Sequence, residues 1–182
     1  MKSKWIGKKI YIRQLQKEDA AALLEINKEN REIFNRYSPV DQEESFFTLK
    51  NHEEMIEAKQ KNWSEDREYG FGIFIKEADK LVGTINLFFV EREVGDKCMI
   101  GYALDHRYTG HGYMTESVQL AVTFAFEEAG FHRIEAGVMP RNTGSIHVLE
   151  NCRFIREGTL RDELKINGKY EDHYIYSRLS TD

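Results

Sequence analysis

Residues 107–116 read RYTGHGYMTE, and the spacing of Arg107, Gly110 and Gly112 within them is typical of a phosphate-binding loop. Because glycine has no side chain, Gly110 and Gly112 can take positive φ and let a phosphate approach the main chain. A helical pattern follows over 116–129, so unpaired N–H groups and the positive end of the helix dipole face the same anion. The guanidinium of Arg107 adds a planar fork of donors. The pattern predicts an anion cradle, or else a strand–helix turn that needs two glycines for its shape.

Histidine, cysteine and acidic side chains are the other groups whose spacing bears on chemistry. His106 and His111 do not stand at a helical ligand spacing, so no metal site is predicted. Cys98 and Cys152 make neither a disulfide framework nor a metal-ligand pattern, and we expect two free thiols. Glu116 lies in the first turn of the helical pattern, where an acid is usually a partner of the helix dipole. The glycine loop therefore carries the strongest functional signal.

The composition limits the class of protein. The chain has 182 residues, which fits one domain over 1–182, and 41% of them are hydrophobic, which is typical of a globular fold. A formal net charge of −5 disfavours wholesale binding to nucleic acid. The charged N-terminal segment lacks a signal-peptide pattern, and no apolar run approaches the ~20 residues that span a bilayer. We therefore expect a cytoplasmic protein without a nucleic-acid or membrane partner.

Hydrophobic periodicity predicts the elements that must position the loop. The expected order is a strand over 9–15, helices over 18–28 and 48–63, strands over 69–76, 81–90 and 97–104, a helix over 116–129, a strand over 133–139, a short helix over 145–151, and strands over 154–166 and 169–178. Gly158 marks an expected bulge, and Asn167–Gly168 is a strong hairpin turn signal. This order predicts an α/β fold in which a mixed sheet carries helices on both faces.

The chain resembles a known family over nearly its whole length, and four segments carry this resemblance. They are Arg107-x-x-Gly110-x-Gly112, Asn142-x-x-Ser145, Glu150-Asn151-Cys152-Arg153-Phe154 and the stretch Ile166–His173. The first resembles the acetyl-CoA pyrophosphate motif of the GNAT superfamily of N-acetyltransferases, and the other three resemble one subgroup of it. In the third segment the cysteine and the arginine depart from the subgroup's pattern. That subgroup contains bacterial enzymes that acetylate the N-terminal alanine or serine of ribosomal proteins.

The resemblance implies the GNAT fold, acetyl-CoA as co-substrate without a metal, and direct transfer of the acetyl group to a primary amine. It places the pyrophosphate on Arg107 and on the N–H groups of Gly110, His111, Gly112, Tyr113 and Met114. It also places the pantetheine arm beside the strand segment that holds Ile100, Tyr102 and Leu104. In the superfamily this strand splays from the next one and opens a V-shaped cleft. Asn142 then either bonds the pantetheine arm, as the resemblance implies, or simply caps the short helix.

Two further roles follow from the resemblance. Ser145 is the candidate donor to the CoA sulfur as thiolate develops, because no tyrosine follows it in the short helix, or else an ordinary helix-start serine. Glu163, with Asp162 beside it, is the candidate general base for the amine, directly or through water, or else part of a solvated strand end. On a regular strand the two carboxylates point to opposite faces, so we expect at most one to face the cleft.

The amine that receives the acetyl group stays open at this point. Tyr37, Phe46 and Phe47 fall in the variable region that walls the acceptor site in this superfamily, or else belong to the core. The subgroup likeness favours a protein N-terminal amine, such as that of a ribosomal protein. The alternatives are a small amine (a polyamine, an amino acid or an aminoglycoside) and a sensor that binds acetyl-CoA without turnover. Both a monomer and a homodimer remain compatible with the sequence.

Overall fold

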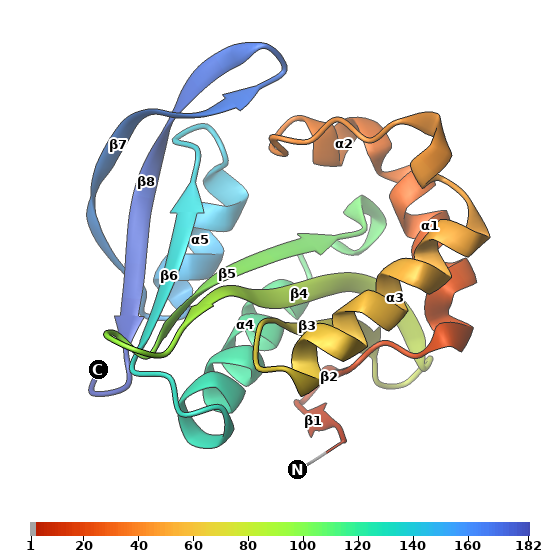
Figure 1. Cartoon of the computed structure of the whole chain (residues 1–182), viewed down its shortest axis with the longest axis horizontal. Coiled ribbons are helices and arrows are strands. Elements are labelled where there is room, and N and C mark those ends of the chain that lie inside the picture. The colour runs from red at the N-terminus through yellow and green to blue at the C-terminus, as the bar shows by residue number, and fades with distance from the viewer. Residues whose placement is uncertain (1–2) are drawn as a thin grey trace.

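The computed structural model describes residues 3–182, which build one eight-stranded sheet and the helices around it (Figure 1). The strands are β1 (Trp5–Ile6), β2 (Ile10–Arg13), β3 (Tyr69–Ile75), β4 (Lys80–Glu91), β5 (Lys97–Leu104), β6 (Arg133–Val138), β7 (Ile155–Ile166) and β8 (Lys169–Leu179). The α-helices are α1 (Ala20–Glu29), α2 (Arg31–Asn35), α3 (Leu49–Ser64), α4 (Tyr113–Thr123) and α5 (Thr143–Asn151). The strand order is β1-β2-β3-β4-β5-β6-β8-β7. The mixed sheet with its helices confirms the predicted fold class.

Two apolar clusters hold the helices to the sheet. Helices α1 and α3 lie side by side (Figure 1) and enclose a small cluster with β2 to β4, made of Tyr11, Leu15, Ala20, Leu23, Ile26, Ile56, Phe74 and Leu81. A larger cluster includes Val118 and Val122 of α4 and Leu149 of α5, together with Phe71 and Ile85 of the central strands. In the helices these apolar residues recur at helical spacing, as Val118 and Val122 do, so that each helix buries one apolar stripe.

The sheet splits between β5 and β6, and this split creates the space for a site. These two strands are parallel and pair at only three positions, Lys97 with Arg133, Cys98 with Ile134 and Met99 with Glu135. Every other neighbouring pair of strands in the described sheet is antiparallel. From Ile100 onward β5 continues along β4 while β6 turns away, so the strands form a V (Figure 1). The carboxyl half of β5 therefore keeps one edge free of strand partners among residues 3–182.

Most element boundaries lie within two residues of the predicted ones, and the larger differences concern α4, β1 and α2. Helix α4 begins at Tyr113, three residues before the expected start, because Gly112 serves as its N-cap. Its continuation, Phe124–Glu128, is a π-helix. The short strand β1 and the short helix α2 were not predicted, since neither is long enough to show a period. The hairpin turn is confirmed, with φ of 50° at Asn167 and 80° at Gly168.

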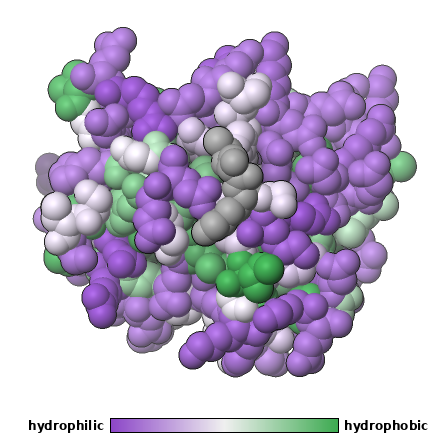
Figure 2. Space-filling model, turned by 90° about the horizontal axis from the view of Figure 1, so that it is seen from below, coloured by the Kyte–Doolittle hydropathy of each residue, from purple (hydrophilic) through white to green (hydrophobic). Residues whose placement is uncertain are grey.

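The face opposite the opening of the V is mostly hydrophilic, with isolated apolar side chains (Figure 2). Scattered apolar groups of this kind are normal on a folded domain. Among residues 3–182 no helix has both the length and the apolar composition that crossing a bilayer requires.

Candidate active site

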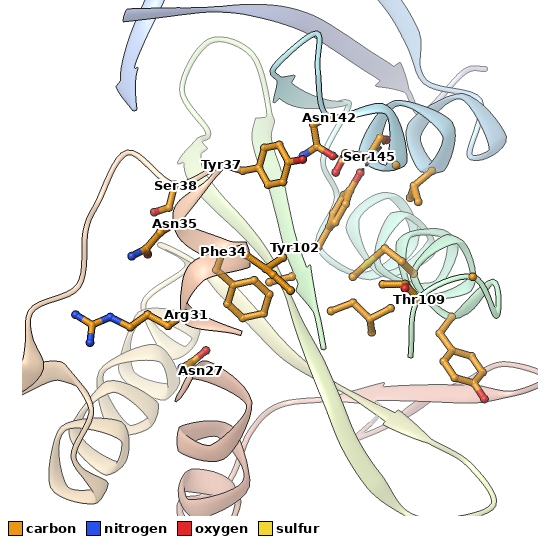
Figure 3. A pocket seen from close by; sticks show the side chains of 18 of the residues that line it. Asn27, Arg31, Phe34, Asn35, Tyr37, Ser38, Tyr102, Thr109, Asn142 and Ser145 are labelled. Carbon is orange, nitrogen blue, oxygen red and sulfur yellow. Dashed lines mark hydrogen bonds between the residues drawn. The ribbon is translucent and has the colours of Figure 1, made fainter. Parts of the chain in front are cut away.

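A cavity of about 680 Å³ lies where the strands diverge (Figure 3). Its walls come from the ends of α1 and α2 with the loop that follows, from the end of β5, from the glycine loop with the start of α4, and from α5. The lining residues are Asn27, Arg31, Ile33, Phe34, Asn35, Tyr37, Ser38, Val40, Gln42, Phe46, Phe47, Tyr102, Ala103, Leu104, Thr109, Gly110, Gly112, Tyr113, Met114, Thr115, Asn142, Gly144, Ser145, His147, Val148 and Asn151. The cavity thus joins the glycine loop to the two polar residues predicted at the start of the short helix.

The glycine loop has the backbone that its sequence predicts. Gly110 and Gly112 have φ of 80° and 79°, in the left-handed region that favours glycine. A Cβ built on either residue would meet no atom within 4 Å, so both glycines border open space. Glu116 N donates to Gly112 O at 3.1 Å, and the amides before it in the first turn of α4 have no intrahelical acceptor. A set of backbone donors and the positive helix end therefore face the cavity.

Arg107 does not line this cavity in the structure, because its side chain is held by a residue of its own loop. Its Nη2 lies 2.7 Å from Oδ2 of Asp105, and its Nε lies 3.1 Å from both carboxylate oxygens. Asp105 is only 1% exposed. Burial alone would raise the pKa of this carboxyl, but the hydrogen bonds and the charge of Arg107, together with a hydrogen bond from Asn30, keep the pKa below its ordinary value. The Asp105–Arg107 ion pair therefore stabilises the conformation of the glycine loop.

Two other contacts tie the loop to the N-terminal part of the chain. Asn30 is fully buried, and its Oδ1 accepts from His106 N at 2.9 Å while its Nδ2 donates to Ile26 O at 2.9 Å. On the opposite side the carboxylate of Glu116 accepts from Lys9 N at 3.0 Å. Glu116 therefore fastens the β1–β2 turn to α4, which is a structural role. Sequence reasoning missed Asn30, whose only signal is an amide at the end of an apolar helical stripe.

His111 lies outside the cavity lining and shapes the loop. Its Nδ1 donates to Thr109 O at 2.8 Å, and its ring stacks on Tyr113 at 5.4 Å between centroids. Lys9 Nζ donates to His111 O at 3.2 Å. The ring therefore contacts the loop itself through Nδ1 and through Tyr113.

The three residues predicted along β5 divide into two groups. Tyr102 and Leu104 line the cavity, whereas Ile100 is buried in the larger apolar cluster. The Tyr102 hydroxyl donates to Ser145 O at 3.3 Å, and burial raises the pKa of this phenol. Figure 3 shows the Tyr102 ring directed toward Ser145. The contact fixes the first turn of α5 relative to β5.

Asn142 and Ser145 both line the cavity at the start of α5. Asn142 is the N-cap, and its Oδ1 accepts from Ser145 N at 3.2 Å. This bond uses the amide oxygen and leaves the amide NH₂ group of Asn142 for another acceptor. Capping and ligand binding are therefore compatible roles of the same side chain.

Asp162 and Glu163 lie outside the cavity lining, and both are exposed. They belong to a bulge of β7 between Leu160 and Leu164, and Asp162 has φ of 49°. Asp162 N donates to Oδ1 of Asp172 at 2.9 Å. Strand alternation does not hold within a bulge, so the faces of these two carboxylates do not follow from their positions in the sequence. Within residues 3–182 no aspartate or glutamate lines the cavity.

The side of the cavity formed by α1, α2 and the loop after α2, where the resemblance places the amine substrate, is aromatic and polar. Tyr37, Phe46 and Phe47 all line it. Asn27 Nδ2 lies 2.9 Å from His52 Nε2, while His52 Nδ1 lies 3.0 Å from Thr48 O. Burial lowers the pKa of His52, so the ring is neutral, donates from Nδ1 and accepts from Asn27. Because Nδ2 of Asn27 donates to His52, the Oδ1 atom of Asn27 remains as a hydrogen-bond acceptor.

Among residues 3–182, Arg31 is the one arginine or lysine that lines the cavity, and its side chain is paired. Its Nη1 contacts Glu44, its Nη2 donates to Gln42 O at 2.9 Å, and its guanidinium lies 4.5 Å from the centre of the Phe47 ring. These contacts hold the loop after α2 in place. Asn27, Arg31, Phe34 and Gln42 were not predicted as site residues, because only the fold brings their segments to the cavity.

Comparison with known proteins gives consistent matches. A family model described as an acetyltransferase (GNAT) domain matches residues 9–155. A Bacillus subtilis (strain 168) protein named "Probable N-acetyltransferase YjcK" is 43% identical over 176 residues, which cover 97% of each chain. The ribosomal protein uS5-alanine N-acetyltransferase of Escherichia coli (strain K12) is 26% identical over 174 residues, 96% of this chain and 89% of the other. The crystal structure of a ribosomal-protein-S5-alanine acetyltransferase from Vibrio fischeri matches with a TM-score of 0.92 and 26% identity, covering 98% of this chain and 97% of that one.

Proposed function

Because the chain belongs to the GNAT acetyltransferase family and is an acetyl-CoA-dependent N-acetyltransferase, we propose that its acceptor is the α-amine at the N-terminus of a protein, of the ribosomal-protein type. Two of the relatives described above are named for acetylating the alanine of a ribosomal protein, and their likeness extends over nearly the whole chain. The similarity to these relatives suggests the acceptor, and the chemistry of the cavity lining supports it.

The observation that carries the proposal is the absence of a carboxylate from the cavity lining within residues 3–182. A polyamine or aminoglycoside carries several positive charges, and burying a charge without a partner is costly. An α-amine has a pKa near ~8 and a lysine-type amine near ~10.4, so the α-amine is far more often neutral at physiological pH. A cavity of aromatic rings, amides and hydroxyls suits a single amine of low pKa that continues into a peptide chain.

Direct transfer requires the amine nitrogen to attack the thioester carbonyl. A C–N bond forms, the C–S bond breaks, the amine loses a proton and the leaving thiolate gains one. Cys98 and Cys152 are free and buried, and burial raises their pKa values to about 12 and about 11. Neither thiol is therefore suited to act as the thiolate nucleophile of a covalent intermediate. This supports direct transfer without an acetyl-cysteine.

We assign the binding of acetyl-CoA to three parts of the chain. The backbone amides of Gly110, His111, Gly112, Tyr113 and Met114 would hold the pyrophosphate, and no atom within 4 Å of a Cβ built on either glycine would obstruct its approach. Arg107 would support this loop through Asp105. The free edge of β5 from Ile100 to Leu104 would pair with the pantetheine amides, as an added strand pairs with a sheet edge. The amide NH₂ of Asn142 would complete these contacts.

Two proton transfers remain to be assigned. The Ser145 hydroxyl would donate to the sulfur as thiolate develops, because it lines the cavity in the first turn of α5. Glu163, with Asp162 as its neighbour, would receive the amine proton through water, since both carboxylates are exposed on the hairpin and outside the cavity.

The proposal is tested by incubating the protein with acetyl-CoA and a panel of acceptors. The panel holds peptides with the N-termini of ribosomal proteins, the same peptides with a blocked α-amine and a free lysine, and spermidine, amino acids and aminoglycosides. Mass spectrometry locates the acetyl group. Acetylation of the free α-amine alone supports the proposal. Transfer to the small amines but not to the peptides would establish the alternative acceptor class, and tight acetyl-CoA binding without any transfer would indicate a sensor.

A further inference from the structure

Arg141 joins two segments that are far apart in the sequence, at the acceptor end of the cavity. Its Nη2 donates to Arg36 O at 2.9 Å, in the loop after α2. The same atom lies 3.6 Å from Oε1 of Glu171, which is on β8 and has a side chain only 20% exposed. The guanidinium also lies 5.3 Å from the centre of the Tyr37 ring. One side chain thus contacts the acceptor-side loop and the terminal hairpin together.

A second bond bridges the same two segments. Asn167, at the tip of the β7–β8 hairpin, donates from Nδ2 to Asn35 O at 3.1 Å. In Figure 1, α2 and the tip of this hairpin face each other across the opening of the V. The two contacts therefore bridge α2 with its following loop to the α5 side of the cavity and to the terminal hairpin.

Arg141 also lies next in sequence to Asn142, at the end of the cavity where α5 begins. The turn that holds both residues is closed by Asn142 N donating to Met139 O at 2.9 Å. Tyr37 reaches across the cavity toward Asn142 (Figure 3). The guanidinium therefore holds the Tyr37 wall against the N-terminus of α5.

We propose that Arg141 is a specificity-determining positioning residue, which sets the width of the cavity between Tyr37 and Asn142 and so restricts the acceptor to a chain end with a small first side chain. This inference rests on the proposed function, because it assumes a peptide acceptor. The planar guanidinium can bond a carbonyl, approach a carboxylate and stack on a ring at the same time. A lysine ammonium at the same position can keep the ion pair but cannot stack in this way.

The first test compares Arg141→Ala and Arg141→Lys with the wild type on two peptides that differ only in an N-terminal alanine or phenylalanine. We expect Arg141→Ala to lower kcat/KM for the alanine peptide about tenfold, because misplacing groups near a reacting centre costs one to two powers of ten. The preference for alanine over phenylalanine should fall, and the KM for acetyl-CoA should stay unchanged. Arg141→Lys should restore part of the preference. Arg67→Ala is the matched control, because it removes the same charge from an exposed pair with Glu65.

The second test does not depend on activity. Trypsin cleaves after arginine, and the Arg36–Tyr37 bond carries the carbonyl that Arg141 holds. We expect cleavage at this bond, followed by mass spectrometry, to be several-fold faster in Arg141→Ala and unchanged in Arg67→Ala. Faster cleavage with an altered peptide preference supports the proposal. An unchanged cleavage rate or an unchanged peptide preference overturns it. A wild type that acetylates no peptide overturns the proposed function instead. In that case the trypsin result still shows whether Arg141 holds the loop after α2 in place.

Discussion

The carboxylate of Asp105 holds the guanidinium of Arg107 beneath the glycine loop, so the arginine of the motif acts within the loop before any ligand is bound. The sequence places Arg107 among the phosphate ligands, and the structure adds that Nε and Nη2 already have a partner. Arg107 can still contribute positive charge near the phosphates, because electrostatic attraction does not require a direct hydrogen bond. The buried carboxylate fixes where that charge sits.

Replacing Asp105 by asparagine should destabilise the protein by about 2 kcal/mol, since it removes hydrogen bonds to a charged buried group. The native pKa of Asp105 is lowered, so its contribution is fully present above the unfolded-state value of about 3.9 and is lost as the pH falls through the native value. Denaturant unfolding from pH 7 to pH 3 should show a wild-type advantage that is constant near neutrality and shrinks below about pH 4. An advantage that grows on acidification would contradict the pairing.

Acetyl-CoA should stabilise the fold through the glycine loop. At ~100 times the dissociation constant, binding adds roughly 2.7 kcal/mol to the free energy of unfolding. Gly112→Val should remove this gain, because its side chain would occupy the open space at the loop. It should also cost about 1–2 kcal/mol by itself, since φ is 79° at this position and a β-branched residue is strained there.

Gly130→Val provides the matched control for that strain. Gly130 has φ of 72°, and a Cβ there also meets no atom within 4 Å, but it does not line the cavity. Thermal unfolding with and without millimolar acetyl-CoA should show the ligand shift in Gly130→Val and its loss in Gly112→Val. No shift in the wild type would remove the basis for placing acetyl-CoA on this loop.

Ser145→Ala should lower turnover about tenfold or more while acetyl-CoA affinity changes little. An interaction made mainly in the transition state affects kcat and kcat/KM together. Thr143→Ala is the control, because Thr143 is an exposed residue of the same helical turn outside the cavity lining. Steady-state kinetics and acetyl-CoA titration separate the two effects. If turnover survives in Ser145→Ala, a water protonates the thiolate and Ser145 is a helix-start residue.

The parts of the fold that follow a local pattern could be predicted from the sequence. The strand over 97–104 has the expected bounds, because alternation is set by neighbouring residues. The glycine φ values and the Asn167–Gly168 turn also follow from the residues themselves. Local signals of this kind locate the glycine loop, the strand that leads into it and the terminal hairpin turn.

Contacts between distant segments could not be predicted in the same way. Arg141 and Arg36 are 105 positions apart, and no periodicity brings them together. The bulge at Asp162 depends on its pairing with β8, so the face of Glu163 could not be read from alternation. The empty edge of β5 arises from a divergence of two strands that pair over only three residues. Each of these features depends on tertiary packing.

The general base is decided by the pH dependence of Asp162→Asn and Glu163→Gln. Glu163 is the proposed acceptor of the amine proton through water, so Glu163→Gln should weaken the decline of rate at low pH, and Asp162→Asn should leave it intact. The effect should be modest, because an α-amine with a pKa near ~8 is already partly neutral near pH 7. Rate profiles from pH 5.5 to 9 with a peptide acceptor measure this. Profiles that match the wild type in both variants would mean that solvent takes the proton, which suits an α-amine far better than a lysine or a polyamine. If the decline of rate at low pH is lost in Asp162→Asn alone, Asp162 is the general base in place of Glu163.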